Sequence, residues 1–154
     1  MAAEAQIMPT AVLFACSRNA VRSPMAAAIA RHYFGRRLII DSAGVEPGEL
    51  DPFAVVVLAE LGIDIAKYRP KTFDALSETA FDLIITLSPE AHHRALDFAH
   101  TRAVQVEYWP LQDPTLALEL GLSRDATLQS YRQARDLLVE RILARLSLGP
   151  LGSM

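Results

Sequence analysis

The chain has 154 residues, of which 51% are hydrophobic and 21% are charged, and its formal net charge is −3. This length and composition are typical of one globular domain and exclude an intrinsically disordered protein. The small negative charge gives no reason to expect nucleic acid or an anionic membrane as a partner, and apolar runs such as residues 53–59 are too short to span a bilayer.

Cysteine usage and the two ends of the chain set the expected compartment and boundaries. Cys16 is the one cysteine, so no intramolecular disulfide can form and a reducing cytosol is the default compartment. No basic segment precedes the first apolar run, so we expect a cytoplasmic protein without a secretory signal. We predict a single domain over residues 10–147, an N-terminal tail at 1–9, and a C-terminal tail at 148–154 that resembles a vector-derived segment.

The first predicted elements flank the cysteine. Residues 11–15 form a short apolar run that predicts a buried strand. Ser23 and Pro24 are the residue types preferred at the N-cap and at the first position of a helix, so we predict a helix that begins there and ends at Gly35. Cys16 therefore stands in a loop between a strand and a helix.

The rest of the chain continues the alternation of strands and helices. Further strands are predicted at 38–40, 81–87 and 103–106, further helices at about 52–61, 89–99 and 124–146, and a short helical turn at 74–77. Strands that alternate with helices pair in parallel through right-handed crossovers, which predicts a doubly wound α/β sheet with helices on both faces. Such sheets bind ligands at the carboxyl ends of their strands, near the switch in strand order.

The loop after the first strand combines a thiol with a guanidinium, because Arg22 follows Cys16 by six residues. Backbone N–H groups in such a loop and the helix N-terminus form an anion nest, which also favours the thiolate form of a cysteine. Arg22 has a planar fork of donors suited to two phosphoryl oxygens, and the Ser23 hydroxyl can donate to the thiolate. A lone cysteine is more often a buried apolar residue, but this spacing favours a nucleophile that attacks a bound phosphate.

Phosphoryl transfer to a thiolate also needs a group that protonates the leaving oxygen, and two aspartates are eligible. Asp51 and Asp113 each follow a predicted strand and precede a proline, a pattern that is equally typical of a helix N-cap. The residues alone leave this choice open. Nucleotide hydrolysis is disfavoured, because the sequence has no glycine-rich phosphate loop that ends in Lys-Ser or Lys-Thr.

Residues 12–26 resemble the signature loop of the low-molecular-weight protein tyrosine phosphatases. That loop has a cysteine, five residues, an arginine and then a serine or threonine, with an internal asparagine that corresponds to Asn19. The similarity spans about residues 10–147, and weaker related segments lie at 42–44, 62–65, 81–85 and 113–114.

The resemblance implies a four-stranded parallel sheet of strand order 2-1-3-4 and a metal-free, two-step mechanism. Cys16 would attack phosphorus to form a cysteinyl-phosphate, Arg22 and the loop amides would hold the phosphoryl oxygens, and Asp113 would act as general acid and base. Ser23 would assist the sulfur, and Asn19 would brace the loop through a hydrogen bond that involves Ser42. The implied phosphate-binding residues are Ser17, Arg18, Asn19, Ala20, Val21 and Arg22.

Some positions depart from the usual pattern of the family. Thr115 and Leu116 replace the aromatic residues that often wall the phosphotyrosine ring, Arg18 replaces a small glycine, and Tyr68 replaces a frequent histidine. Val21 stands where many members have a second cysteine. These changes retain the chemistry and leave the preference for phosphotyrosine open.

The expected substrate is a phosphorylated protein or a small phosphomonoester, and we expect no cofactor and no metal because the four histidines match no metal-ligand spacing. Three alternatives remain. Arsenate reductases share this fold and loop, and a version that uses a small external thiol would need Cys16 alone. The chain could instead be a phosphoarginine phosphatase, or an anion-binding module without turnover.

Overall fold

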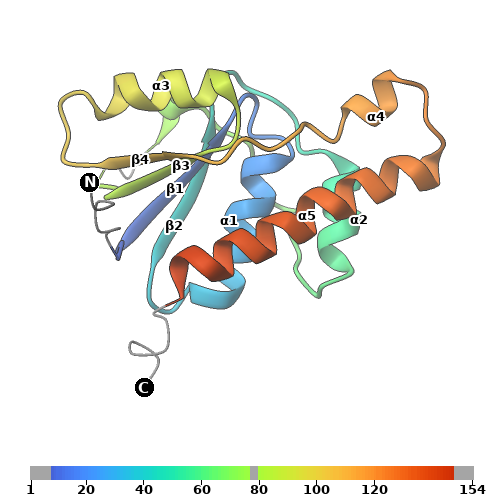
Figure 1. Cartoon of the computed structure of the whole chain (residues 1–154), viewed down its shortest axis with the longest axis horizontal. Coiled ribbons are helices and arrows are strands. Elements are labelled where there is room, and N and C mark those ends of the chain that lie inside the picture. Colours follow the sequence, from blue (N-terminus) through green and yellow to red (C-terminus); the bar gives the residue numbers. More distant parts are fainter. Residues whose placement is uncertain (1–7, 77–79, 148–154) are drawn as a thin grey trace, which may run out of the picture.

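The computed structural model describes residues 8–76 and 80–147 and contains one four-stranded parallel sheet (Figure 1). The strands are β1 (Ala11–Cys16), β2 (Ile39–Gly44), β3 (Leu83–Thr86) and β4 (Gln105–Tyr108), and their order is β2-β1-β3-β4. The predicted doubly wound sheet and its strand order are thus confirmed. Of the tails predicted from the sequence, residues 1–7 and 148–154 lie outside the described residues.

Helices cover both faces of the sheet (Figure 1). The helices are α1 (Arg22–Phe34), α2 (Pro52–Ala59), α3 (Pro89–Ala99), α4 (Leu116–Glu119) and α5 (Arg124–Leu146), with a short 3₁₀ helix at Phe73–Ala75. Helices α1 and α5 pack together on one face, α2 packs against α5, and α3 packs on the opposite face against β1, β3 and β4.

The central strand β1 contributes to a separate core on each face, because successive side chains of a strand point to opposite sides. Val12 and Phe14 pack into the core beneath α1 and α5. Leu13 and Ala15 pack into the core beneath α3. Since both faces are buried, β1 is apolar throughout, and Cys16 at its end is held in a fixed position.

Element boundaries differ from the sequence prediction where polar residues continue a strand. The second strand extends to Gly44 because its backbone pairs with β1 as far as Cys16. Its polar side chains have partners, since Asp41 pairs with Lys71 at 2.6 Å between Oδ1 and Nζ and the Ser42 hydroxyl is hydrogen-bonded to Tyr68. The fourth strand begins two residues later than predicted. Helix α2 ends before Gly62, which adopts a positive φ of 76° in the following turn. Helix α4 was not predicted, whereas the bounds of α5 match the prediction.

The predicted N-cap role of Ser23 is wrong. Helix α1 begins at Arg22, its N-cap position is Val21, and no side chain caps it. The Ser23 hydroxyl instead lies 3.0 Å from the Cys16 sulfur. Asp51, which fits a cap pattern in the sequence, does cap α2, and Ser88 caps α3, since their side chains accept from backbone N–H groups in the first turns of these helices.

Among the described residues, no helix combines the length and the hydropathy that a membrane crossing requires.

An ion-pair network fixes α5 to the end of α2. The Glu60 carboxylate accepts from Arg132 at 2.8 Å and from Arg135 at 2.7 Å. These hydrogen bonds, first that of Arg132 and then that of Arg135, lower the pKa of Glu60 from its usual 4.5 to about 2. A carboxyl group with a lowered pKa in the folded state contributes stability above its unfolded pKa, and that contribution is lost as the pH falls toward 2.

We expect Glu60→Gln to lower the urea midpoint of unfolding at pH 7 and to lose this effect progressively below about pH 4.5. The control is Asp74→Asn, which removes a 3.1 Å ion pair with Arg94 at a side chain that is 91% exposed, and which we expect to change the midpoint little. An effect of Glu60→Gln that is as large near pH 2 as at pH 7 would contradict the assignment.

Candidate active site

The candidate site lies at the carboxyl ends of the parallel strands, where β1 and β3 are neighbours but their following segments diverge. We refer to residues 16–22 as the cysteine loop. This loop follows β1, and Ser88 follows β3; the Ser17 hydroxyl joins them through a 3.0 Å hydrogen bond to the Ser88 Oγ. The site therefore occupies the switch in strand order that doubly wound sheets use for ligands.

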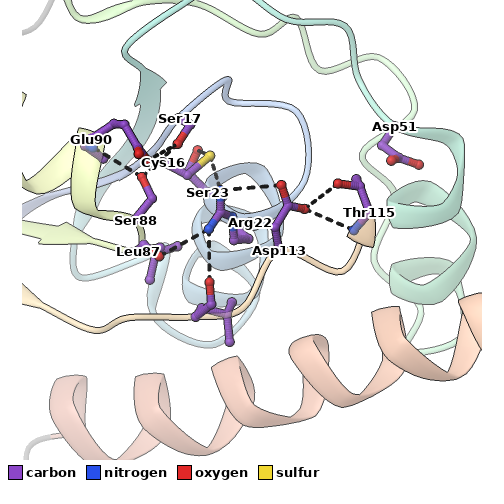
Figure 2. Close-up of polar contacts among 12 residues, drawn as sticks. Cys16, Ser17, Arg22, Ser23, Asp51, Leu87, Ser88, Glu90, Asp113 and Thr115 are labelled. Carbon is purple, nitrogen blue, oxygen red and sulfur yellow. Dashed lines mark hydrogen bonds and ion pairs between the residues drawn. The ribbon is translucent and has the colours of Figure 1, made fainter. Parts of the chain in front are cut away.

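Three hydrogen-bond donors surround the sulfur of Cys16. The backbone N–H of Asn19 lies 3.3 Å from Sγ and the backbone N–H of Ser23 lies 3.4 Å away. The Ser23 Oγ lies 3.0 Å from Sγ (Figure 2). Donors aimed at a sulfur stabilise its anionic form. The surroundings of Cys16 therefore suit a thiolate nucleophile and do not resemble those of an inert core cysteine.

A chain of side-chain hydrogen bonds sets the direction in which the Ser23 hydroxyl donates. The Asn19 Oδ1 accepts from the Tyr68 hydroxyl at 2.5 Å and from the backbone N–H of Lys71 at 2.8 Å. The Asn19 amide nitrogen must then face the other way, and it donates to the Ser23 Oγ at 2.7 Å. That contact occupies a lone pair of Ser23, so the Ser23 proton points elsewhere, and the Cys16 sulfur at 3.0 Å is nearer than its other acceptor, the Ala43 carbonyl at 3.5 Å.

The predicted contact between Asn19 and Ser42 runs through Tyr68. The Tyr68 hydroxyl has one proton and gives it to Asn19, so the Ser42 hydroxyl donates to the Tyr68 oxygen over 2.6 Å. Sequence reasoning did not assign this role to Tyr68. Tyr68 lies 49 residues from Asn19, and no local pattern links them.

Backbone geometry holds the cysteine loop in its shape. Asn19 has a positive φ of 56°, which asparagine tolerates better than most residues. The backbone of Gly44, at the end of β2, packs against the backbone of Arg18 and Asn19. A Cβ atom at position 44 would lie 2.7 Å from both, so the loop leaves room only for glycine there. The backbone N–H of Glu46 donates to the Ser17 carbonyl at 3.0 Å. Within the described part of the chain, the N–H groups of Arg18, Ala20 and Val21 have no partner, so they remain available to an anion.

The guanidinium of Arg22 is fixed along one edge by backbone carbonyls. Its Nη1 donates to the Leu111 carbonyl at 3.0 Å and lies 3.5 Å from the Leu87 carbonyl. These carbonyls follow β4 and β3, so the sheet itself orients the side chain. Arg22 is 8% exposed and lines the cleft next to Cys16, where the remaining N–H groups suit a bidentate contact with an oxyanion.

Asp113 lies on the same side of the cleft as Arg22. Its Oδ2 is 3.7 Å from the Arg22 Nη2 (Figure 2). Its Oδ1 accepts from both the backbone N–H and the hydroxyl of Thr115, at 3.0 and 2.8 Å. One oxygen of Asp113 therefore stabilises the turn at Thr115, and the other oxygen faces the guanidinium of Arg22. The Asp113 side chain is 46% exposed.

Asp51 is also in the wall of the cleft, but both of its oxygens have partners in the protein. The Oδ1 accepts from the Phe53 N–H at the start of α2, and the Oδ2 accepts from the Tyr131 hydroxyl at 2.6 Å. Burial, followed by the hydrogen bond to Asp51, raises the pKa of Tyr131, which keeps that hydroxyl protonated as a donor. Figure 2 shows Asp51 beside α2, with Thr115 between it and Asp113 in this view.

Glu90 is a cleft residue that sequence reasoning missed. It lies in the first turn of α3 and accepts from the Ser17 hydroxyl at 2.9 Å. Its own backbone N–H and then the Ser17 hydroxyl lower the pKa of Glu90, with a smaller contribution from the charge of Arg22. The sequence does contain a pattern that could have identified Glu90. An acidic residue in the first turn of a helix that follows a strand lies near the carboxyl edge of the sheet, where the site is.

The cleft has a volume of about 1060 Å³. The predicted site residues that line it are Cys16, Ser17, Arg18, Ala20, Val21, Arg22 and Asp113. Three further predicted residues lie behind the loop, fully buried: Asn19, Ser23 and Ser42.

A doubly wound sheet of this order, with a cysteine after β1 and an arginine at the start of α1, defines a class of small α/β proteins with one anion-binding loop. The chain belongs to the low molecular weight phosphotyrosine protein phosphatase family, whose sequence pattern matches residues 11–142.

Relatives in this family differ in their activities. The chain is 34% identical to an arsenate reductase of Bacillus subtilis (strain 168) over 107 residues, which are 69% of this chain and 75% of the relative. A solved arsenate reductase in the phosphate binding state has a TM-score of 0.69 and 26% identity, and the match covers 89% of this chain and 96% of that one. The low molecular weight protein tyrosine phosphatase from T. tengcongensis has a TM-score of 0.69 and 26% identity, with 86% and 94% covered.

We expect Tyr68→Phe to slow alkylation of Cys16 by iodoacetamide at pH 7 several-fold, because the Ser23 hydroxyl is no longer held as a donor to the sulfur. The lost hydrogen bonds should also lower the free energy of unfolding by about 1–2 kcal/mol. The reaction is followed by intact mass, since the chain has one thiol. Tyr33→Phe, at a 47% exposed residue of α1, is the control. Equal alkylation rates in the wild type and Tyr68→Phe would contradict the role of Tyr68.

Proposed function

We propose that this protein is a cysteine-dependent phosphomonoester hydrolase, a protein tyrosine phosphatase that works through a cysteinyl-phosphate. The observation that carries the proposal is the position of Asp113, whose Oδ2 lies 3.7 Å from Arg22 in the cleft that also contains Cys16. The cleft is thus lined by a nucleophile, a guanidinium that can bind an oxyanion, and a candidate general acid. The free thiol that this chemistry needs persists in a reducing cytosol, where we place the protein.

In the first step, the Cys16 thiolate attacks phosphorus, a sulfur–phosphorus bond forms, and the bond from phosphorus to the leaving oxygen breaks. Arg22 and the free N–H groups of the cysteine loop bind the equatorial oxygens, where negative charge spreads in the transition state. Asp113, protonated in the substrate complex, transfers its proton to the leaving oxygen. The Ser23 hydroxyl stabilises the sulfur before attack and again when the sulfur departs.

In the second step, water attacks the cysteinyl-phosphate and Asp113 accepts a proton from that water. The sulfur–phosphorus bond breaks, the thiolate is restored, and inorganic phosphate leaves. One carboxyl group thus serves as acid and then as base, as the reversal of proton flow between the two steps requires.

The contacts of the three carboxylates favour Asp113 as the acid. Both oxygens of Asp51 accept protein hydrogen bonds, one of them from a protonated Tyr131. Glu90 has a lowered pKa, so it remains ionised and is a poor proton donor. Asp113 has one oxygen directed at Arg22 and a half-exposed side chain, which a leaving group can reach.

A second candidate function is arsenate reduction with a small external thiol, and the relatives named arsenate reductase favour it. Attack of Cys16 on arsenate would form a sulfur–arsenic bond with loss of a water molecule. Reduction to arsenite needs two electrons, so a second thiol must attack the Cys16 sulfur, form a disulfide and leave the electron pair on arsenic. The chain has one cysteine, so that thiol must come from another molecule.

A panel assay separates these functions. Phosphate release is measured from phosphotyrosine, phosphoserine and phosphoarginine, and arsenate-dependent consumption of glutathione is measured in parallel, with Cys16→Ser as the blank. We expect release from phosphotyrosine and no thiol consumption. Arsenate-dependent thiol consumption without phosphate release would establish the second candidate, and preferred release from phosphoarginine would replace the tyrosine preference. No turnover of any compound would mean an anion-binding module.

Asp113→Asn should lower kcat/KM for an alkyl or phenyl phosphate by about a hundredfold but kcat/KM for p-nitrophenyl phosphate by less than about tenfold, because kcat/KM reports the step in which the leaving group departs and a good leaving group needs little protonation. The matched control is Asp51→Asn, which alters a carboxylate in the same cleft. That variant should lose stability without any dependence on the leaving group, since asparagine has one accepting oxygen for two donors, the Phe53 N–H and the Tyr131 hydroxyl. Equal losses on both substrates in Asp113→Asn would refute its role as the acid.

A further inference from the structure

Helix α4 forms the wall between the catalytic cleft and a second hollow. Thr115 and Glu119 line the cleft. Leu116 and Leu120 line a groove of about 370 Å³ between α4 and α5. Asp113 lines both hollows, so the groove is continuous with the cleft at the proposed general acid.

The groove is lined mainly by apolar side chains that water reaches. Its apolar lining includes Leu111, Leu116, Leu120, Leu122, Ala134 and Leu137. Leu116 is 36% exposed, Leu120 66% and Leu122 46%. Three partly exposed leucines within seven residues form a contiguous apolar patch, and such patches mark binding surfaces when they stand beside a functional cleft.

The size of the groove limits what it can hold. Its volume lies near the lower end of the range for ligand pockets, about 300–1,000 Å³, so it has room for one or two apolar side chains. A stable dimer buries about 800 Å² of each partner, which is far more than one short groove beside a four-residue helix provides. The continuity with the cleft at Asp113 instead suits a segment that already has its phosphorylated residue in the cleft.

The charge of the cleft indicates that the segment is a peptide with a positive side chain. Outside the cysteine loop, four acidic residues besides Asp113 line the cleft: Glu49, Asp51, Glu90 and Glu119. Arg18 is the one cation of the lining besides Arg22. An excess of carboxylates around the entrance favours a basic residue close to the phosphorylated one.

We propose that the groove between α4 and α5 is a docking site for an apolar side chain of a phosphorylated protein substrate, with a basic residue of the same segment facing the acidic wall of the cleft. This inference rests on the proposed phosphatase function. It assigns selection of the protein substrate to α4, outside the residues that perform the chemistry.

The test uses phosphotyrosine peptides with one lysine, in which a single leucine is placed in turn at each nearby position on either side of the phosphotyrosine. At one or more positions the leucine should raise kcat/KM about tenfold over the leucine-free peptide, the effect expected from burying most of one leucine side chain. Leu120→Ser and Leu122→Ser should abolish this gain. Turnover of p-nitrophenyl phosphate, which is too small to reach the groove, should change less than about twofold.

Leu118→Ser is the matched control. Leu118 belongs to the same helix and is 47% exposed, but it does not line the groove, so its replacement should leave the leucine preference intact. The proposal is overturned if leucine gives no gain at any position, if the gain persists in Leu120→Ser and Leu122→Ser, or if Leu118→Ser removes it as well. It is also overturned if the wild type is a dimer by light scattering and Leu120→Ser is a monomer, since the groove would then bind a second copy.

These outcomes are separate from the fate of the proposed function. If the wild type hydrolyses p-nitrophenyl phosphate but ignores the leucine, the docking site is wrong and the phosphatase assignment stands. If the wild type releases no more phosphate than Cys16→Ser from p-nitrophenyl phosphate and from every peptide, the proposed phosphatase function is wrong. The docking site, which rests on that function, is then wrong as well.

Discussion

The side-chain amide of Asn19 is the constraint on which the rest of the site depends. Two donors, the Tyr68 hydroxyl and the Lys71 N–H, fix its oxygen, and this directs its nitrogen to the Ser23 hydroxyl, which lies 3.0 Å from the Cys16 sulfur. Asn19 also has a positive φ, and its backbone N–H donates to the Cys16 sulfur. One buried residue thus couples the shape of the loop to the stabilisation of its nucleophile.

The sheet supplies the other half of the site. Backbone carbonyls after β3 and β4 orient the guanidinium of Arg22, and the loop after β4 brings Asp113 to its other side. Residues from four distant parts of the chain therefore converge because parallel strands end at one edge. Nothing in this arrangement distinguishes phosphate from arsenate, which have the same charge and shape. The two proposed chemistries differ in the reductant, because arsenate reduction in a chain with one cysteine consumes a thiol from another molecule and phosphoryl transfer consumes none.

Much of this fold could be predicted because the alternation of strands and helices is regular and β1 is apolar throughout. The long helix α5 could be predicted with its bounds from its sustained apolar spacing, and in the structure Ser123 caps its first turn. The strand β4 was misplaced by two residues because it is a half-exposed edge strand without an apolar run. Cys16 and Arg22 were identifiable from spacing alone, whereas Tyr68 was not, because its contact with Asn19 forms only in the folded chain. Ser23 fits a cap pattern, yet the thiol and the Asn19 amide engage its hydroxyl.

The most direct test of the central claim is a rapid-quench experiment with Asp113→Asn and p-nitrophenyl phosphate. In this variant the good leaving group still departs, but water activation is slowed, so the covalent intermediate should accumulate. Mass spectrometry of the acid-quenched protein should then show one phosphoryl group on the peptide that contains Cys16, and none in the double variant that also carries Cys16→Ala. Release of p-nitrophenol without any phosphoryl group on Cys16 would contradict the mechanism and leave the cysteine loop as an anion-binding site only.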